Sequence, residues 1–567
     1  MSFNLWYNRI RISTEEKKAK QNERLLLILS GLLMGVGFPP FPFPFTLFLF
    51  VGLIPYFIVI EKRKTLAEIN RATYLAFFVF SVITLYWVGS WQKESDPFLM
   101  IAGGTLLFFE PILFLIPSTL FYLAKKSFSG TAALFLFPMS WAAYEYLYML
   151  TDISFPWLTL GHGLAEFILF IQIADTIGAV GLSIVVIYIN IFLYKAFFNL
   201  KLSKRKFLLN LSTALIICFL MLGYGFFRLD TFHVSNKIIK VGLIQPNLNP
   251  WDKWNDKNLN NLTIEYLNLS QQAVNKGARL IIWPETALPV FLMDGSYSIT
   301  LDSIYSFLRR NNVYLLTGMP DVKYFYPGEN APYDAKTNSR ENISYATYNG
   351  ILLLSPDTRI VQRYAKMKLV PFGERVPFVS QLPILGKLIR WSVGISSWNV
   401  GKDTVNFKLP DIEDNISPSQ TYSKDSISIN GLVCYESVFP YFVTNFVQRG
   451  AKLIAIVTND SWYGKSSGPY QHKEISVLRA VENRRTVLRA ANGGISCIIN
   501  PLGKTIIESK LFTKDVIVGD ASLESTKTFF TKYPLIIPEI SLGVSLWIFG
   551  IFILKKIKGK WLTSQIK

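Results

Sequence analysis

Three segments of the sequence place a side chain suited to covalent catalysis directly after an apolar run. They are Trp283-Pro284-Glu285, Tyr364-Ala365-Lys366 and Leu432-Val433-Cys434. Reacting groups of α/β folds collect at the ends of strands. A thiol can attack a carbonyl carbon, a carboxylate can accept the thiol proton, and an ammonium can stabilise the oxyanion that forms. Together, Cys434, Glu285 and Lys366 predict acyl transfer through a covalent intermediate.

Each of these side chains also has an ordinary structural explanation. A cysteine that ends an apolar strand usually serves as a small buried hydrophobe. A glutamate after Trp-Pro often belongs to a loop or a cap, and a lysine in a loop is usually solvated. The catalytic interpretation therefore depends on the elements that would bring the three side chains together.

Those elements lie in the region 237–525, where short β-branched runs alternate with amphipathic patterns. Strands are expected near 238–244, 280–283, 313–318, 347–355, 426–434, 452–458 and 494–500, and helices near 258–276, 298–311, 438–449 and 470–489. Alternation of this kind in one region of this size predicts a layered α/β domain.

The rest of the chain is too apolar for a wholly soluble protein. Half of the 567 residues are hydrophobic and 17% are charged, whereas soluble proteins carry about 25% charged residues. Most apolar runs approach the roughly 20 residues that cross a bilayer, and they lie near 25–38, 42–60, 72–91, 98–124, 130–149, 166–198, 207–228 and 535–554. The run 166–198 is long enough to be tilted or broken, because Gly178 and Gly181 lie inside it.

The sequence therefore predicts a helical membrane domain and a separate α/β domain. We expect a leader over 1–24, a membrane domain of seven spans over 25–228, a catalytic domain over 229–533 with its core at 237–525, an eighth span over 535–554 and a tail over 555–567.

The net charge of +19 is divided unevenly along the chain. Residues 237–525 carry 32 basic and 25 acidic side chains, a net of +7, which leaves +12 for the rest. An excess on the apolar part favours lipid headgroups and membrane topology over nucleic acid. Basic residues gather in the leader, the tail and alternate loops, so the positive-inside rule predicts that 229–533 lie outside the cytoplasm.

Other reactive or buried polar residues have structural explanations. Three cysteines cannot form a disulfide framework, and Cys218 and Cys497 are expected to pack in apolar surroundings. His472 has no cysteine or aspartate at metal-ligand spacing, so we expect it to make a structural hydrogen bond. We expect the same of Glu110, which lies inside a predicted span.

The catalytic segments resemble the nitrilase, or carbon-nitrogen hydrolase, superfamily, whose members use a Glu–Lys–Cys set. The resemblance covers about 237–525 and continues through Thr458-Asn459-Asp460-Ser461-Trp462-Tyr463-Gly464, Gly468-Pro469-Tyr470-Gln471-His472 and Arg489-Ala490-Ala491-Asn492-Gly493-Gly494. It implies a four-layer α-β-β-α sandwich. The roles that it implies are proton acceptor for Glu285, oxyanion stabiliser for Lys366, nucleophile for Cys434, and support from Glu374, Tyr435 and Glu436.

With its membrane spans, nearly the whole chain resembles the apolipoprotein N-acyltransferase family. The resemblance is carried by Leu369-Val370-Pro371-Phe372-Gly373-Glu374-Arg375-Val376-Pro377, Phe155-Pro156-Trp157-Leu158 and Lys253-Trp254. It implies a multi-pass inner-membrane enzyme whose catalytic domain faces the periplasm, with candidate substrate contacts at Trp157, Trp254, Pro377 and Trp391. Polar insertions near 322–345 and 411–425 depart from the family pattern.

The family implies a reaction in two steps. Cys434 takes an acyl chain from a membrane phospholipid as a thioester, and the N-terminal amine of a lipoprotein's S-diacylglyceryl-cysteine then accepts it. No metal, other cofactor or nucleic acid is implied. Two alternatives stay open: a membrane-tethered amidase that transfers the acyl group to water, and a transporter or assembly factor whose outer domain merely binds.

One segment of the α/β region is unusually apolar for a loop. Val376–Trp391 is too short and interrupted to cross a membrane, yet too apolar for an ordinary exposed loop. It would either pack into the domain's own core or rest on the outer leaflet as a lid, with Lys387 and Arg390 at headgroup level.

Overall fold

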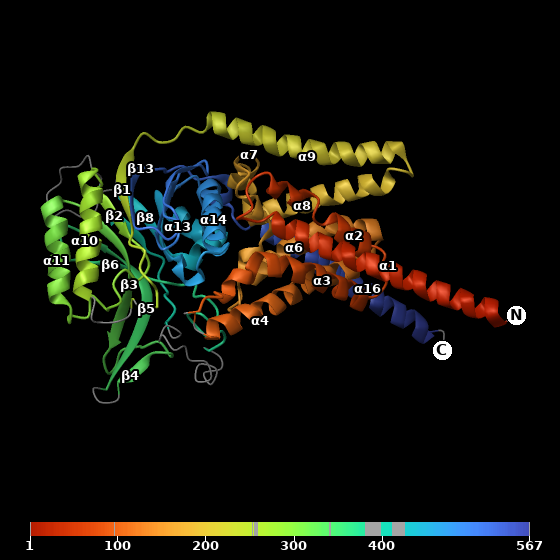
Figure 1. Cartoon of the computed structure of the whole chain (residues 1–567), viewed down its shortest axis with the longest axis horizontal. Coiled ribbons are helices and arrows are strands. Elements are labelled where there is room, and N and C mark those ends of the chain that lie inside the picture. Colours follow the sequence, from red (N-terminus) through yellow and green to blue (C-terminus); the bar gives the residue numbers. More distant parts are fainter. Residues whose placement is uncertain are drawn as a thin grey trace.

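The computed structural model describes residues 2–93, 95, 97–251, 253, 259–338, 342–379, 398–410 and 426–565. Figure 1 shows two parts side by side: a bundle of long helices, with both chain termini at its far end, and a layered α/β domain. The α/β domain is one continuous stretch between the bundle helices α9 (Lys204–Thr231) and α16 (Ile536–Gln565).

The bundle contains helices that could cross a membrane. Among the described residues, five helical stretches are long and apolar enough: Leu66–Gly89, Pro97–Ser127, Ala174–Asn199, Lys204–Thr231 and Ile536–Lys558. Besides α9 and α16, the bundle is built from α1 (Ser2–Val36), η1 (Phe45–Phe50), α2 (Ile54–Ile60), α3 (Leu66–Leu85), η2 (Tyr86–Gly89), α4 (Pro97–Leu113), α5 (Leu115–Ser127), α6 (Gly130–Met149), η3 (Pro156–Leu158), η4 (Leu160–Leu164), α7 (Ile168–Ile171) and α8 (Ala174–Asn199). The count of eight spans stays a prediction.

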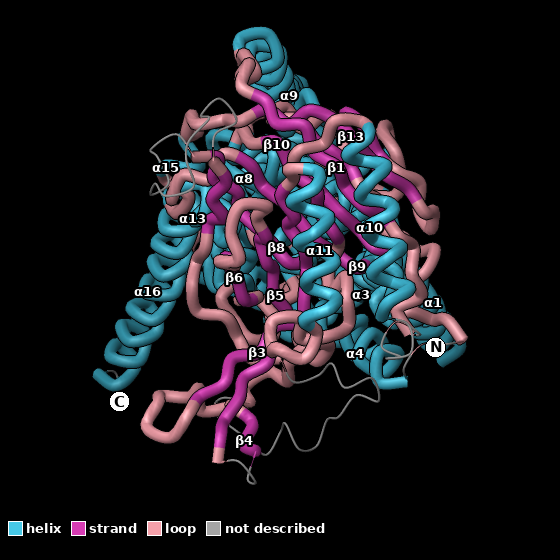
Figure 2. The backbone as a smooth tube through the Cα atoms, turned by 90° about the vertical axis from the view of Figure 1, so that its left-hand side faces the viewer, coloured by secondary structure: helices cyan, strands magenta, loops and turns pink. Residues whose placement is uncertain are grey.

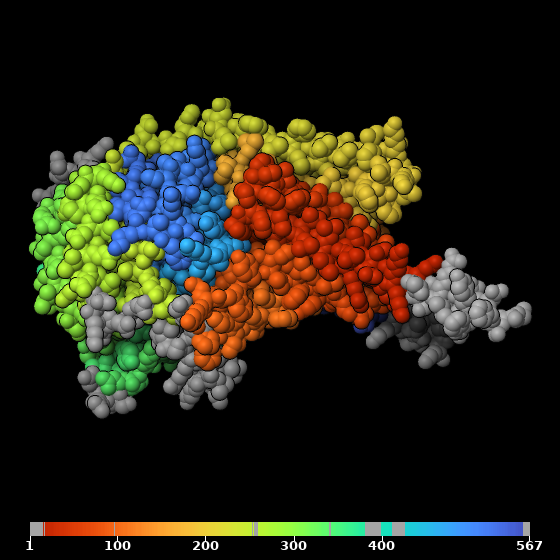
Figure 3. All heavy atoms as spheres, in the orientation of Figure 1, coloured from red at the N-terminus to blue at the C-terminus, as the bar shows by residue number. Residues whose placement is uncertain are grey.

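Local sequence explains where several of these helices begin and break. α3 begins with a capping box, in which Thr65 Oγ1 accepts from the Glu68 N–H at 3.3 Å and the Glu68 carboxylate accepts from the Thr65 N–H at 3.2 Å. α8 is interrupted at Gly178, whose φ of 65° is not helical, so of the two alternatives given for 166–198, tilted or broken, the structure shows a break. α9 lies along the outside of the bundle (Figures 1 and 3) and exposes apolar side chains such as Phe219 and Phe226, as expected of a lipid-facing helix.

The α/β domain contains two sheets. Among the described residues, the first has seven strands in the order β13-β1-β2-β3-β5-β4, with β6 beside β5, and the second has six in the order β12-β11-β10-β9-β8-β7. The strands of the first sheet are β1 (Ile238–Gln245), β2 (Leu280–Trp283), β3 (Tyr314–Phe325), β4 (Lys336–Asn338), β5 (Ile343–Leu354), β6 (Gln362–Ala365) and β13 (Asp515–Ser522). Those of the second are β7 (Asn406–Leu409), β8 (Ile427–Val433), β9 (Leu453–Asn459), β10 (Thr486–Asn492), β11 (Cys497–Ile499) and β12 (Thr505–Glu508).

Helices cover the outer face of each sheet. α10 (Leu259–Asn275) and α11 (Ser298–Asn311) lie over the first sheet, in front of its strands in Figure 2, and α13 (Pro440–Gln448) and α14 (Gly468–Asn483) lie over the second. The predicted four-layer α-β-β-α sandwich is confirmed. Strands β8, β9 and β10 pair in parallel and are buried along their whole length, which explains why their sequences show little alternation.

One predicted boundary is wrong. The helix expected over 470–489 ends at Asn483, and Thr486–Asn492 form β10 instead. Arg484 ends the helix with a left-handed φ of 48°. Buried arginines in this stretch, among them Arg485 and Arg489, hide the strand from a reading of hydrophobicity alone.

Of the two predicted insertions, the first lies mostly within the described residues. The one near 322–345 lengthens β3 and β5 into a hairpin that projects from the first sheet, with β4 at its edge (Figure 2). The one at 411–425 lies outside the described residues.

Buried polar contacts join the α/β domain to the bundle. Arg484, which follows α14, forms an ion pair with Asp175 of α8 at 2.7 Å, with both side chains at most 4% exposed. Glu482 of α14 accepts a hydrogen bond from the backbone N–H of Ala179 at 2.9 Å, directly after the break at Gly178. The α/β domain therefore packs on the bundle through buried polar contacts, one of them an ion pair.

Candidate active site

Glu285, Lys366 and Cys434 line one cavity between the two sheets. Glu285 follows β2 and Lys366 follows β6 in the first sheet, whereas Cys434 follows β8 in the second. Each sheet therefore contributes part of the set, and the packing of one sheet on the other brings the parts together.

Lys366 links two carboxylates. Its Nζ lies 2.8 Å from Glu374 Oε1 and 3.7 Å from Glu285 Oε1, and the side chain is 1% exposed. Asn349 of β5 donates to the same two oxygens, at 2.7 Å to Glu285 and 3.0 Å to Glu374. The backbone carbonyl of Asn349 also accepts from the Lys366 N–H at 2.8 Å. Asn349 thus fixes the positions of both carboxylates and of the Lys366 backbone relative to one another.

Burial and charge together set the ionisation of the site. Burial alone lowers the pKa of Lys366, but the charges of Glu374 and Glu285 outweigh it, so the pKa is raised and the ammonium stays charged. Burial raises the pKa of Glu285 despite the attraction of Lys366. Burial also raises the pKa of the Cys434 thiol, and the nearby Glu285 adds to the effect. The resting site therefore holds a protonated thiol near a carboxylate that can accept its proton.

Cys434 occupies a strained turn. It begins η6 (Cys434–Val438) with a left-handed φ of 51°, a conformation that costs a non-glycine residue on the order of 1–3 kcal/mol and persists only when its surroundings fix it. Glu436 fixes this turn: its Oε2 accepts from the Val433 N–H at 2.9 Å and its Oε1 from the Met367 N–H at 2.7 Å. Glu436 thereby ties the turn of Cys434 to the turn of Lys366.

Aromatic side chains line the cavity beside these residues. They are Trp251, Trp398, Trp462 and Tyr463. The rings of Trp251 and Trp462 meet edge to face, with centroids 4.9 Å apart. Sequence reasoning missed all four as site residues, although Trp462 and Tyr463 stand in a motif that carried the family resemblance.

A second, apolar cavity adjoins the first. It lies between α4 and the loop 370–378, and the two cavities share Leu99, Val370, Gly373 and Tyr463. Large apolar side chains on its wall are 40–63% exposed: Phe98, Ile101, Phe372 and Phe378. An apolar cavity at the outside of the bundle therefore borders the cavity that holds Cys434.

The candidate substrate contacts have different positions. Trp157 is buried and Pro377 is buried, and neither lines either cavity, although Phe378 lines the apolar one. Trp254 and Trp391 lie outside the described residues, as does most of the segment Val376–Trp391 that was expected to form a lid or pack in the core. Their roles stay predictions.

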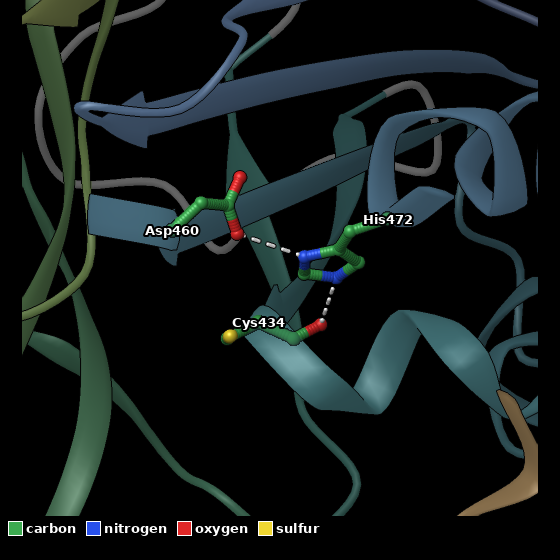
Figure 4. A group of neighbouring side chains, drawn as sticks. All are labelled: Cys434, Asp460 and His472. Carbon is green, nitrogen blue, oxygen red and sulfur yellow. Dashed lines mark hydrogen bonds and ion pairs between the residues drawn. The ribbon is translucent and has the colours of Figure 1, made fainter. Parts of the chain in front are cut away.

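Cys434, Asp460 and His472 lie close enough together to raise the question of a metal site. Figure 4 shows the Cys434 sulfur directed away from the imidazole ring, whereas its carbonyl points toward it. His472 Nδ1 lies 2.9 Å from Asp460 Oδ1, and Nε2 lies 3.2 Å from the Cys434 carbonyl oxygen. Since both ring nitrogens already have protein partners, the group does not offer the free imidazole and thiolate that zinc requires. The structural hydrogen bond expected of His472 is confirmed.

The other cysteines and the intramembrane acid lie apart from this chemistry. Cys497 is buried in β11 and Cys218 lies in α9, and neither lines the cavities. Glu110 accepts a hydrogen bond from the Tyr148 hydroxyl at 2.8 Å, so the bond to another helix expected of it is confirmed.

Comparisons with known proteins agree with this architecture. The carbon-nitrogen hydrolase family model matches residues 240–529, and the model of the apolipoprotein N-acyltransferase N-terminal domain matches residues 30–192. An apolipoprotein N-acyltransferase of Chlorobaculum tepidum is 32% identical over 92% of this chain and 94% of its own length. One of Rickettsia bellii is 30% identical over 96% of this chain and 99% of its own.

Solved structures of nitrilase-superfamily proteins align with part of this chain. Nit3 of Saccharomyces cerevisiae, a member of the nitrilase superfamily, aligns with 54% of this chain and 97% of its own at 14% identity and a TM-score of 0.36. The family models and the near full-length relatives account for both parts of the chain. The protein belongs to the apolipoprotein N-acyltransferase family, membrane acyltransferases whose catalytic domain is of the nitrilase type.

Proposed function

We propose that Cys434 carries an acyl chain, as a thioester, from a membrane phospholipid to the N-terminal amine of a lipoprotein's S-diacylglyceryl-cysteine. The junction of the two cavities supports this most directly. An acyl chain lying along α4 in the apolar cavity would place its ester carbonyl beside Cys434. The names of the relatives support an apolipoprotein as the acceptor.

In the first half-reaction, Glu285 accepts the thiol proton while Cys434 Sγ attacks the ester carbonyl carbon. The thiolate is the reactive form, and burial raises the pKa of this thiol, so the base has to act during the attack. Lys366 and the backbone N–H of Tyr435 stabilise the oxyanion. When the tetrahedral intermediate collapses, the lysophospholipid oxygen leaves with the proton held by Glu285.

In the second half-reaction, the lipoprotein amine attacks the thioester carbonyl. The same two donors hold the oxyanion, and Glu285 accepts the proton that the amine loses. Collapse forms the amide bond and breaks the bond to sulfur, and Cys434 regains its proton from Glu285. A thioester suits this step because it remains reactive toward amines.

The arrangement of the two parts supports an inner-membrane location with the catalytic domain in the periplasm. Both termini lie at the end of the bundle opposite the α/β domain (Figure 1), and both terminal segments are rich in basic residues. Basic flanks of membrane spans remain in the cytoplasm, which leaves the α/β domain on the other side.

The test is to incubate the purified enzyme with phospholipid that is labelled in its acyl chain. We expect a hydroxylamine-sensitive label on the protein that is absent from Cys434→Ala and is discharged by a diacylglyceryl-cysteine peptide. Cys497→Ala is the matched control and should be labelled like the parent enzyme. A label that persists in Cys434→Ala would refute the nucleophile, and discharge to water in preference to the peptide would favour the amidase alternative.

A further inference from the structure

The turn Cys434–Val438, which begins with the nucleophile, belongs to the α/β domain but is held in place by residues of the helix bundle. Tyr435, the residue after Cys434, is 3% exposed and its hydroxyl donates to the backbone carbonyl of Ser154, which precedes η3 in the helix bundle. The Tyr435 ring stacks on Phe155, with centroids 6.0 Å apart and planes 18° from parallel. One flank of the turn is therefore attached to a loop of the bundle.

On its other side, the turn of Cys434 contacts a residue of helix α14. His472 contacts the Cys434 carbonyl oxygen through Nε2 at 3.2 Å and Ser437 Oγ at 3.0 Å, and Ser437 donates to the same carbonyl at 2.8 Å. Asp460, which also pairs with Arg489, fixes the imidazole from its other side. The Trp157 ring packs against His472, with centroids 5.4 Å apart.

Gln471, next to His472, connects α14 to the bundle. Its Oε1 accepts from the indole N–H groups of Trp157 at 2.8 Å and Trp87 at 3.0 Å. Its Nε2 donates to the carbonyls of Pro39 at 2.8 Å and Thr84 at 3.1 Å. All four partners belong to bundle segments, and Gln471 is 3% exposed, so both ends of its amide are fully used inside the interface.

Fixing the Cys434 carbonyl has a consequence for the oxyanion. A trans peptide unit is planar and its C=O and N–H point in opposite directions. Because His472 and Ser437 hold the carbonyl on one side, the N–H of Tyr435 is directed to the other side, where Figure 4 shows the Cys434 sulfur. The same contacts that orient the carbonyl thus orient the backbone donor assigned to the oxyanion.

We propose that the bundle loop Ser154–Leu158 positions the oxyanion donor of the catalytic domain, directly through Tyr435 and indirectly through Trp157, Gln471 and His472. The inference rests on the proposed function, since it concerns the same intermediate. It makes Trp157 a positioning residue rather than a contact of the lipid. Catalytic competence would then depend on docking between the two parts of the chain.

The decisive variants are Trp157→Phe, which keeps an aromatic side chain but replaces the indole and so removes its N–H, and Gln471→Met, which keeps the length and removes all four hydrogen bonds. Gln172→Met is the matched control. Gln172 is also fully buried at this interface and bonds Arg484 at 2.7 Å, but it touches neither flank of Cys434. The assay measures the burst of acyl-enzyme formation with labelled phospholipid and with the small ester p-nitrophenyl butyrate. Iodoacetamide alkylation of Cys434, which needs no oxyanion, is measured in parallel.

We expect Trp157→Phe and Gln471→Met to lower the maximal acylation rate with both donors, with unchanged KM and alkylation. The loss should reach about tenfold to a hundredfold, below the 10²–10³ typical when an oxyanion donor is removed outright. Gln172→Met should acylate like the parent. A rise in KM for phospholipid alone would overturn the proposal and make Trp157 a lipid contact. Equal slowing by Gln172→Met, or a parallel loss of alkylation, would overturn it in favour of a purely structural role. A burst that survives Cys434→Ala would instead refute the proposed function.

Discussion

Replacing Lys366 by arginine should show whether catalysis depends on the exact position of the cation or only on its positive charge. Nζ of Lys366 lies 2.8 Å from Glu374 and 3.7 Å from Glu285, and the side chain is 1% exposed. A planar guanidinium keeps the charge but cannot place a compact ammonium at that point. Because the charge is kept, both carboxylates stay paired, and the variant avoids the roughly 3–5 kcal/mol lost when a buried ion loses its partner.

The expected defect is therefore in rate rather than in folding. Loss of one oxyanion donor costs about 10²–10³ in rate, or roughly 2.7–4 kcal/mol of transition-state stabilisation. The assay is the acylation burst with labelled phospholipid, together with the thermal midpoint of unfolding. Lys368→Ala is the control, since the Lys368 ammonium lies 5.2 Å from the Phe439 ring and lines neither cavity. A burst of parental size and rate in Lys366→Arg would refute the role given to Lys366.

Three further predictions concern the groups around the catalytic set. In Glu285→Gln the acylation burst should be lost, because the base is gone. In the parent enzyme, the acylation rate should rise with pH as Glu285 loses its proton. Because burial raises the pKa of Glu285, that rise should lie above the pH range in which an exposed glutamate titrates. A pH–rate profile that is flat down to pH 4.5 would contradict this base. In Gly318→Ala the new Cβ would lie 2.6 Å from the Glu285 Cα, so kcat should fall about tenfold or more by displacement of a catalytic group, whereas Gly543→Ala, which meets open space, should not alter it. In Asp334→Asn, loss of the 2.5 Å pair with Arg375 should cost at most about 1 kcal/mol of stability, because both side chains keep some solvent contact. Arg375 directly follows Glu374, so its pair with Asp334 should help to hold the loop that carries Glu374. The acylation rate of Asp334→Asn should therefore fall further than its unfolding midpoint suggests. Unchanged kinetics would show that the hairpin of β3 and β5 does not support this loop.

Some site residues could be predicted from the sequence and others could not. Glu285 and Cys434 stand at the ends of buried strands, where a change from apolar to reactive side chains is visible in the sequence. Asn349 has no such mark, since it lies within β5 and acquires its role only when the first sheet brings it beside Lys366. The partners of Gln471 are more than 300 residues away along the chain, so no local pattern contains them.

The same limit explains the boundary error at the end of α14. Arg484, Arg485 and Arg489 are charged residues in a fully buried stretch, and a hydrophobicity pattern assigns such residues to the surface. Their burial is possible because partners from distant elements neutralise or bond them: Asp175 for Arg484, carbonyl oxygens for Arg485 and Asp460 for Arg489. The α/β layering itself needed no such partners, and local periodicity was enough to predict it.

The ion pair between Arg484 and Asp175 has a practical consequence for anyone who wishes to produce the catalytic half alone. A fragment that begins after α9 would lack Asp175, Trp87 and Trp157, leaving Arg484 and Gln471 without the partners that made their burial possible. The cut would also expose aromatic side chains that the bundle now covers, among them Tyr435, which stacks on Phe155, and Tyr441, which meets Tyr146 edge to face, and large exposed apolar patches promote aggregation. A water-soluble version for inhibitor screening would therefore require a redesigned docking face rather than a well-chosen truncation point.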